Sequence, residues 1–273
     1  MSVFILGHPC RDEIIIGDEK SYTVGGPSYY QAHVFKELGY ENFEVICNSP
    51  AYLFNCFPKN TRVLLIPNEA HHVFTNEYPD KDNLDIRVQS SNFPKIPLKV
   101  DQIQDYLHGR TVDAFIINPL NPYDFPLETI EFLKTFNVPI YISIQGFLRY
   151  KNKKSFGLRP NRHIKEIVEG AAAIFLDEAE AQYVPLDELD VDEIIITNGS
   201  NGSRIISEGD EIKIDAVQSD NVVDTTGCGD TFMATYIVLK LEGYSSTQAA
   251  NFASQIASEK THYSGPYKAD NSL

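Results

Sequence analysis

Basic residues are scarce in this sequence. It has 23 Lys and Arg residues against 38 Asp and Glu residues, which gives a formal net charge of −15 at pH 7. Such an acidic surface repels nucleic acid and anionic membrane, so neither is an expected partner. An anionic substrate such as ATP would have to be held by local features that overcome this field, such as helix N-termini and metal ions.

Cysteine is also rare, and long apolar runs are missing. The chain of 273 residues has four cysteines, no two of them in a C-x-x-C pair, which argues against a disulfide-stapled small fold. Residues 1–6 lack the basic and apolar regions of a signal peptide, and no stretch approaches the ~20 apolar residues of a membrane span. We therefore expect reduced thiols and a cytoplasmic protein.

Histidine-based metal motifs are absent as well. His71-His72 and His262 stand without an HExxH pattern, so we expect surface or lid histidines rather than metal ligands. His8 and Arg11, which follow the first apolar run, are expected to be ordinary loop residues.

Short apolar runs alternate with longer helical segments along the chain, which predicts a single α/β domain over residues 1–273 with a mostly parallel sheet between layers of helices. The predicted strands are Ser2–Leu6, Glu44–Asn48, Arg62–Ile66, Asp113–Ile117, Val138–Ile144, Ala172–Leu176 and Glu193–Thr197. The predicted helices are Tyr29–Leu38, Leu127–Phe136, Thr231–Leu241 and Ser246–Lys260.

Three segments depart from this alternation. Residues 14–24 and 71–93 mix aromatic and β-branched residues with charges, and we expect exposed antiparallel ribbons that form a small β lid. Residues 203–207 and 211–215 flank Glu208-Gly209-Asp210, which predicts a hairpin. An exposed lid ribbon also offers an edge through which two copies of the chain could pair.

A glycine-rich turn, Asp224-Thr225-Thr226-Gly227-Cys228-Gly229-Asp230, precedes the helix at Thr231–Leu241. Two glycines at a helix N-terminus let main-chain N–H groups converge on an anion, and the helix dipole adds to this attraction. Asp230 lies where an ionised carboxylate can accept a proton from an attacking hydroxyl. The turn lacks the Gly-Lys-Ser/Thr end of a Walker A loop and the third glycine of a Rossmann fingerprint.

This turn resembles the C-terminal signature of the ribokinase-like (PfkB) carbohydrate kinases, Asp-Thr-x-Gly-x-Gly-Asp, at every fixed position. The resemblance implies a three-layer α/β/α sandwich with a small β lid, and an enzyme that uses ATP and Mg²⁺ to phosphorylate a small-molecule hydroxyl. It implies that Asp230 is the catalytic base, and that the amides around Gly227, Cys228 and Gly229 form the anion hole.

Other motifs follow in the order that the family has them. By this resemblance Asp12, Gly25 and Gly26 hold the acceptor, and Gln145 and Arg149, in a Gln-Gly-Phe-x-Arg stretch, also reach substrate or phosphate. From local sequence alone, the first three fit a solvated loop and a turn before a helix. The last two fit an exposed loop in which Phe147 packs inward.

The remaining motifs are assigned to the nucleotide and the metal. Thr197, Gly199 and Gly202, together with Thr225, match the positions that line the family's nucleotide site, although a Gly/Asn turn is the default interpretation. Asp177 and Glu180 match the Asn-x-x-Glu pair that organises Mg²⁺, often through water, with Asp in the Asn position. An acidic helix start explains this pair equally well.

Three departures from the family pattern, at Tyr30, Ser143 and Asp177, leave a second interpretation open: a non-catalytic sugar- or nucleoside-binding protein that retains the kinase fold. A third possibility is a kinase for a vitamin or hydroxymethyl-pyrimidine, whose usual members lack a β lid. The acceptor among sugars, inositols, other polyols and nucleosides is not specified by the sequence.

Overall fold

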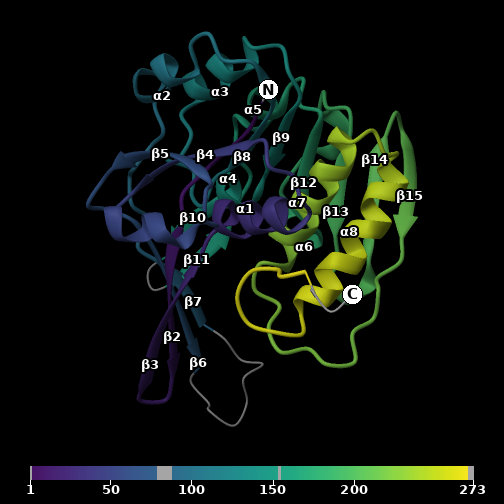
Figure 1. Cartoon of the computed structure of the whole chain (residues 1–273). Coiled ribbons are helices and arrows are strands. Elements are labelled where there is room, and N and C mark those ends of the chain that lie inside the picture. The colour runs from purple at the N-terminus through teal and green to yellow at the C-terminus, as the bar shows by residue number, and fades with distance from the viewer. Residues whose placement is uncertain (1, 79–87, 153–154, 270–273) are drawn as a thin grey trace.

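A nine-stranded sheet with strand order β15-β14-β13-β12-β9-β8-β1-β4-β5 forms the centre of the molecule (Figure 1). The computed structural model describes residues 2–78, 88–152 and 155–269. Seven strands run parallel, and the last two form an antiparallel hairpin at one edge. The strands are β1 (Ser2–Gly7), β4 (Phe43–Ser49), β5 (Arg62–Pro67), β8 (Val112–Asn118), β9 (Ile140–Ser143), β12 (Ala173–Asp177), β13 (Ile194–Thr197), β14 (Ser203–Ser207) and β15 (Asp210–Ile214).

Helices cover both faces of this sheet. Successive strand residues point to opposite sides, so each face contributes its own set of side chains to a buried cluster. Val3 and Ile5 of β1 belong to one buried cluster, and Phe4 and Leu6 belong to another. The first cluster includes residues of α1 (Pro27–Glu37), α7 (Cys228–Leu241) and α8 (Ser246–Lys260). The second includes residues of α2 (Val100–Leu107), α3 (Leu127–Lys134) and α5 (Ile164–Val168). The predicted α/β/α sandwich is confirmed.

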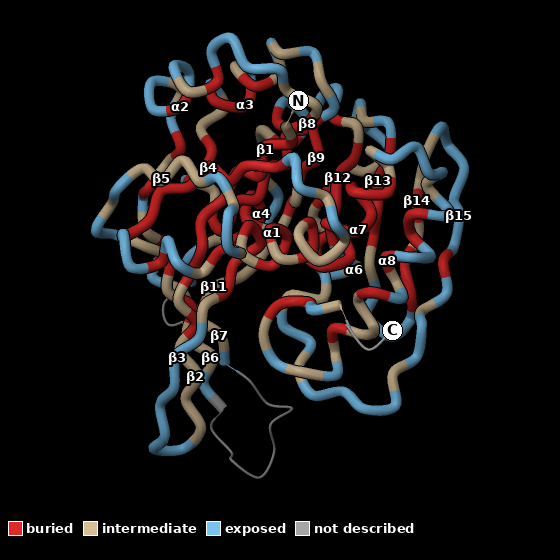
Figure 2. The backbone as a smooth tube through the Cα atoms, in the orientation of Figure 1, coloured by how far each residue is buried: buried red, intermediate tan, exposed pale blue. Residues whose placement is uncertain are grey.

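A second sheet of four strands projects from the main body, and Figure 2 shows that its far end is exposed. Its order is β3 (Glu19–Gly25), β2 (Cys10–Ile16), β6 (His72–Tyr78) and β7 (Val88–Ser91). β2 pairs antiparallel with β3 and parallel with β6. The predicted ribbons are therefore strands of one small sheet, and residues 79–87 of the second ribbon lie outside the described part of the chain.

All seven predicted core strands, the four helices and the β14–β15 hairpin are present, with ends shifted by a few residues. The sequence did not predict α2, nor the hairpin of β10 (Arg149–Asn152) and β11 (Ser155–Leu158). Two one-turn helices, α4 (Gln145–Leu148) and α6 (Glu178–Ala181), follow β9 and β12 at their carboxyl ends. Across the described residues, the helices are all too short or too polar to cross a lipid bilayer.

Candidate active site

The glycine-rich turn forms the N-terminus of α7. Gly227 is the N-cap residue in a left-handed conformation (φ 80°), and a Cβ atom there would lie 2.5 Å from the ring of Tyr30. Both the backbone conformation and the lack of space require glycine at this position. The turn therefore places Asp230 in the first turn of the helix, as the sequence predicted.

The amides of this turn differ from the expected anion hole in one respect. The N–H of Cys228 donates to the carbonyl oxygen of Thr225 at 3.2 Å, so that amide is already used within the turn. First-turn amides of a helix have no acceptor within the helix, which leaves those of Gly229 and Asp230 for an anion. Gly229 is exposed, and a Cβ atom there would have no atom within 4 Å, so the space beside this residue is open.

Asp230 has the electrostatic properties of a base that works near neutral pH. Burial of its carboxyl group raises its pKa from 3.8 to about 7. The positive charge of Arg149 lowers this pKa, while the negative charges of Glu180 and Asp12 raise it further. These four charged groups come from β10, α6, β2 and α7, so the fold brings together residues that the sequence assigned to separate motifs.

Arg149 is buried, with 9% of its surface exposed, rather than part of an exposed loop. Its guanidinium carbon lies 5.1 Å from the ring centre of Phe74 and 4.9 Å from that of Phe156, and Nη1 donates to the carbonyl oxygen of Leu120 at 3.1 Å. Burial lowers the pKa of Arg149, and the charge of Glu180 opposes that shift. Gln145, the first residue of α4, is partly exposed.

Asp12 and Arg11 both lie on β2, whereas the sequence predicted a loop there. Asp12 faces the glycine pair. A Cβ atom on Gly25 would lie 2.2 Å from Oδ2 of Asp12, and one on Gly26 would lie 2.7 Å from the carbonyl oxygen of His8. The thiol of Cys10 donates to Oδ1 of Asp12 at 3.4 Å. The pair therefore lets the chain pass close to Asp12 before α1 begins.

The charges of two carboxylates, those of Asp12 and Asp230, act on Tyr30. Burial raises the pKa of its phenol, and the charges of Asp12 and Asp230 raise it further, so the phenol lies near both groups. Its ring packs against the position of Gly227. The departure from the family pattern at Tyr30 therefore lies inside the site, where it can influence which acceptor fits.

Asp177 and Glu180 cap α6 through a reciprocal pair of hydrogen bonds. The N–H of Glu180 donates to Oδ1 of Asp177 at 2.8 Å, and the N–H of Asp177 donates to Oε2 of Glu180 at 2.9 Å. Burial and the charge of Asp177 raise the pKa of Glu180 to about 7. A cation would relieve this unfavourable charge, and each carboxylate keeps a second oxygen for it, so the pair fits a hydrated Mg²⁺. The structural and the metal-binding interpretations are thus compatible.

The predicted nucleotide residues lie at the same edge of the sheet. Thr197 ends β13 and is the register partner of Asp177 on β12. Gly199 is exposed, whereas Gly202 is buried in a left-handed conformation, and a Cβ atom there would lie 2.2 Å from the carbonyl oxygen of Ile214. Gly202 is therefore required by packing, and Thr225, in the glycine-rich turn, is exposed.

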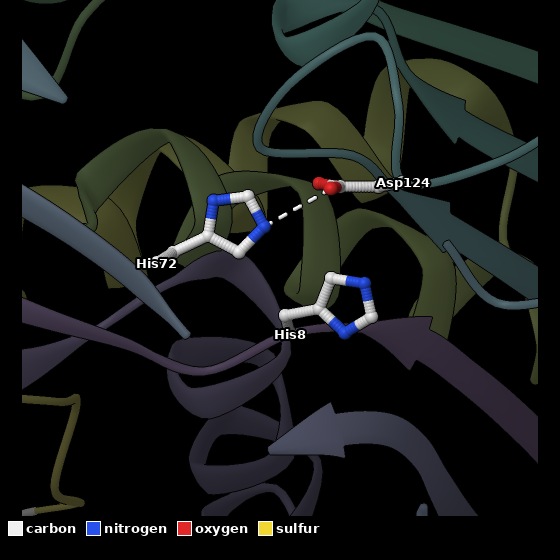
Figure 3. Close-up of side chains that lie close together, drawn as sticks. All are labelled: His8, His72 and Asp124. Carbon is white, nitrogen blue, oxygen red and sulfur yellow. Dashed lines mark hydrogen bonds and ion pairs between the residues drawn. The ribbon is translucent and has the colours of Figure 1, made fainter. Parts of the chain in front are cut away.

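Sequence reasoning missed a buried cluster of His8, His72 and Asp124 (Figure 3). All three side chains have 0% exposure. His8 lies in the loop after β1 and His72 lies on β6 of the small sheet, as expected, but neither is at the surface. Nε2 of His72 lies 3.0 Å from Oδ1 of Asp124, and the two imidazole rings stack at 5.5 Å. The three residues are 8, 72 and 124 in the chain, so no local pattern signals them.

The donor atoms of this cluster lie within 4.8 Å of one another, as in a metal site. However, the main-chain N–H of Asn48 donates to Nδ1 of His8 at 3.0 Å, so the single proton of the neutral ring must lie on Nε2. Burial lowers the pKa of His8 to about 4, which keeps the ring neutral. A nitrogen that carries a proton is no ligand, so we interpret His72 and Asp124 as a hydrogen-bonded pair, with the ring of His8 stacked on that of His72.

The comparisons with known proteins agree with this geometry. Residues 143–272 match the model of the pfkB family carbohydrate kinases. A ribokinase of Arabidopsis thaliana is 30% identical over 102 residues, which are 37% of this chain and 27% of that protein. The aligned stretches cover between 27% and 38% of the curated relatives that match.

Solved structures match over almost the whole chain. A pyrophosphate-dependent kinase in the ribokinase family has a TM-score of 0.83 at 19% identity, with 98% of this chain and 97% of that chain covered. A nucleoside kinase of Methanocaldococcus jannaschii has a TM-score of 0.73 at 18% identity, with 97% and 93% covered. These likenesses show a ribokinase fold over nearly the full length. The match at residues 143–272 shows that the C-terminal part of the chain is similar to the pfkB family carbohydrate kinases.

Proposed function

We propose that this protein is a kinase that transfers a phosphoryl group from ATP to a hydroxyl group of a sugar, a polyol such as inositol, or a nucleoside. The observation that carries the proposal is Asp230, a carboxyl group with a pKa of about 7 beside the amides at the N-terminus of α7. A base whose pKa lies near the working pH is well suited to accept a hydroxyl proton.

In the proposed reaction, Asp12 and the backbone at Gly25 and Gly26 orient the acceptor so that one hydroxyl faces Asp230. Asp230 takes the proton as the hydroxyl oxygen attacks the terminal phosphorus. The bond from that phosphorus to the bridging oxygen breaks, and ADP leaves with that oxygen. The amides of Gly229 and Asp230 and the guanidinium of Arg149 then stabilise the negative charge on the transferring group. Phosphoryl transfer needs little beyond such positioning and electrostatic stabilisation.

Mg²⁺, when bound, would neutralise part of the charge on the donor phosphates. Asp177 and Glu180 are the residues that would hold it, through water or directly. The neighbouring Thr197, Gly199 and Thr225 would line the nucleotide site, with Gly202 shaping the turn that carries it.

The donor has an alternative with a specific basis. The structural neighbour with a TM-score of 0.83 is described as pyrophosphate-dependent and complexed with a pyrophosphate analog and myo-inositol. The site proposed here recognises the phosphates of the donor, which ATP and pyrophosphate share. Pyrophosphate therefore belongs in the assay as a second donor.

The small sheet is proposed to act as a lid that keeps water from the acceptor. Its presence removes the argument for a vitamin or hydroxymethyl-pyrimidine kinase, which rested on the absence of such a ribbon. β3 forms one edge of this sheet, and Glu19–Thr23 are exposed. Pairing of two copies along this edge remains a proposal, which light scattering of the purified protein tests.

The experiment is a phosphoryl-transfer assay with Mg²⁺, a panel of sugars, inositols and nucleosides, and either ATP or pyrophosphate as donor. We expect turnover with at least one combination, and a loss of about 10²–10⁴-fold in Asp230→Asn with acceptor binding retained. The control is Asp210→Asn, at the exposed start of β15. Ligand binding without turnover in both wild type and Asp230→Asn would instead support the non-catalytic binding protein.

A further inference from the structure

The buried pair of His72 and Asp124 lies where the small sheet meets the main body. His72 is on β6, and Asp124 is in the loop after β8. Neither side chain is exposed, so their hydrogen bond of 3.0 Å is shielded from water. Burying a carboxylate is costly unless it is fully hydrogen-bonded, and such a pair is retained only where the surroundings satisfy it.

Asp124 is well satisfied. Its Oδ2 accepts from the main-chain N–H of Leu120 at 2.7 Å and from that of Asn121 at 3.0 Å, while Oδ1 faces His72. Burial by itself would raise the pKa of Asp124, but the nearby imidazole of His72 holds it below its usual value. The ionised carboxylate therefore fixes the shape of the loop at residues 120–124.

The same loop holds Arg149. The carbonyl oxygen of Leu120, whose N–H is bound by Asp124, accepts from Nη1 of Arg149. The guanidinium also lies over Phe74, which is two residues beyond His72 on β6. Leu120, Phe74 and Cys10 form one buried cluster, against which Phe156 packs. Arg149 is thus held by the loop, by Phe74 of β6 and by Phe156 of β11. The first two of these contacts depend on the position of β6 against the loop.

We propose that His72 and Asp124 are positioning residues, which join the small sheet to the loop at residues 120–124 and thereby fix the guanidinium of Arg149 at the active site. The inference rests on the proposed function, in which Arg149 stabilises the transferring group. In this proposal, the same group of hydrogen bonds attaches the small sheet to the main body and positions the guanidinium of Arg149.

The main test is a double-mutant cycle between His72→Phe and Arg149→Met. The phenyl ring keeps the stacking volume of His72 beside His8 and Phe74 but removes the donor to Asp124. We expect kcat of His72→Phe to be about 10- to 100-fold below that of wild type, because small displacements of a catalytic group have effects of that size. In the double variant kcat should stay within about twofold of Arg149→Met alone, because His72 acts through Arg149.

Two further variants separate positioning from folding. His71→Phe makes the same substitution one residue earlier, on a side chain that hydrogen-bonds to Tyr52 and to the carbonyl oxygen of Glu69, and should leave kcat unchanged. His72→Gln keeps an N–H donor and should recover part of the lost rate. Losses that multiply in the double variant, or an equal loss in His71→Phe, would overturn the proposal.

A second readout needs no turnover. Nitrogen-15 NMR of the arginine side chains follows the exchange of the Arg149 guanidinium protons with water, and Arg149→Met identifies the signal by its loss. We expect exchange to be several-fold faster in His72→Phe and unchanged in His71→Phe. If wild type transfers no phosphate but exchange is still faster in His72→Phe than in wild type, the proposed function is wrong and the positioning proposal stands. Identical exchange in all three proteins rejects the positioning.

Discussion

The ammonium group of Lys260 lies 3.0 Å from the main-chain oxygen of Asp224, at the start of the glycine-rich turn. Lys260 is the last residue of α8 and is fully buried. It also donates to the carbonyl oxygen of Tyr263 at 3.3 Å and lies 3.5 Å from Oδ2 of Asp224. The Asp224 carboxylate in turn accepts from the N–H of Thr226 at 2.8 Å, so one buried charge anchors the start of the glycine-rich turn.

Replacing Lys260 with Met should therefore weaken both the fold and the reaction. The main-chain oxygens of Asp224 and Tyr263 lose their charged donor, which costs about 1–3 kcal/mol of unfolding free energy. Urea denaturation measures this cost, and kcat measured well below the unfolding transition should fall because the turn loses its anchor. The control is Lys165→Met, which removes an exposed pair with Glu188 and should cost only about 0–1 kcal/mol. Equal stability losses in the two variants would contradict this account.

Gly227→Ala should destabilise the protein. Its left-handed φ of 80° and the contact of 2.5 Å with the Tyr30 ring both oppose a methyl group, and such strain costs about 1–3 kcal/mol. Tyr30 is buried, so Tyr30→Ala lowers stability by itself, and the comparison is made within that background. There the clash is gone but the backbone strain remains, so Gly227→Ala should cost less unfolding free energy than it does in the wild-type background, but still a measurable amount. No cost in the Tyr30→Ala background would mean that the backbone conformation is not strained.

Gly229→Ala should leave stability nearly unchanged but reduce activity. A Cβ atom there meets nothing within 4 Å, and alanine is favoured over glycine in a helical turn, so stability should change by less than about 1 kcal/mol. The methyl group would, however, occupy the open space in front of the amides, where the transferring phosphate is proposed to bind. We expect an unchanged melting temperature with a markedly reduced kcat/KM for the donor. Normal kcat/KM would show that the phosphate binds elsewhere.

Glu180→Gln should raise the Mg²⁺ concentration needed for half-maximal activity by about tenfold, the lower end of the range for perturbing metal sites. The buried carboxylate of Glu180 is the group that a cation would relieve, since its pKa is raised to about 7. Glu178→Gln is the matched control, because Glu178 lies on the same helix but pairs with Arg204. A Mg²⁺ dependence equal to wild type in Glu180→Gln would remove this residue from the metal site.

Local elements could be predicted from the sequence, but contacts between residues far apart in the chain could not. The strands and helices follow from local apolar patterns, and the glycine-rich turn, which carries Asp230, is one contiguous motif. Asp12 was predicted in a loop because its charged neighbours conceal β2, whose pairing with β3 and β6 depends on segments elsewhere in the chain. The contacts between His72 and Asp124 and between Lys260 and Asp224 span 52 and 36 residues, and no local pattern encodes them.

The pH dependence of activity and of stability should both trace to Asp230. The base must be ionised, so kcat/KM should rise with pH through about 7 and level off above it. Because Arg149 lowers the pKa of Asp230, Arg149→Met should move this rise to higher pH. Glu180 also has a pKa of about 7, so the rate profile alone does not assign the group.

The pH dependence of stability identifies which of the two groups causes this rise in kcat/KM. The pKa of Asp230 is raised on folding from 3.8 to about 7, so the folded state holds the proton more tightly and loses stability as pH rises between these values. Asp230→Asn removes that penalty. Its melting temperature should exceed that of wild type at pH 8, and the difference should shrink towards pH 4, whereas Asp210→Asn should show no such trend. A difference that stays constant from pH 4 to pH 8 would mean that Asp230 titrates normally, and the rise in kcat/KM would then belong to Glu180.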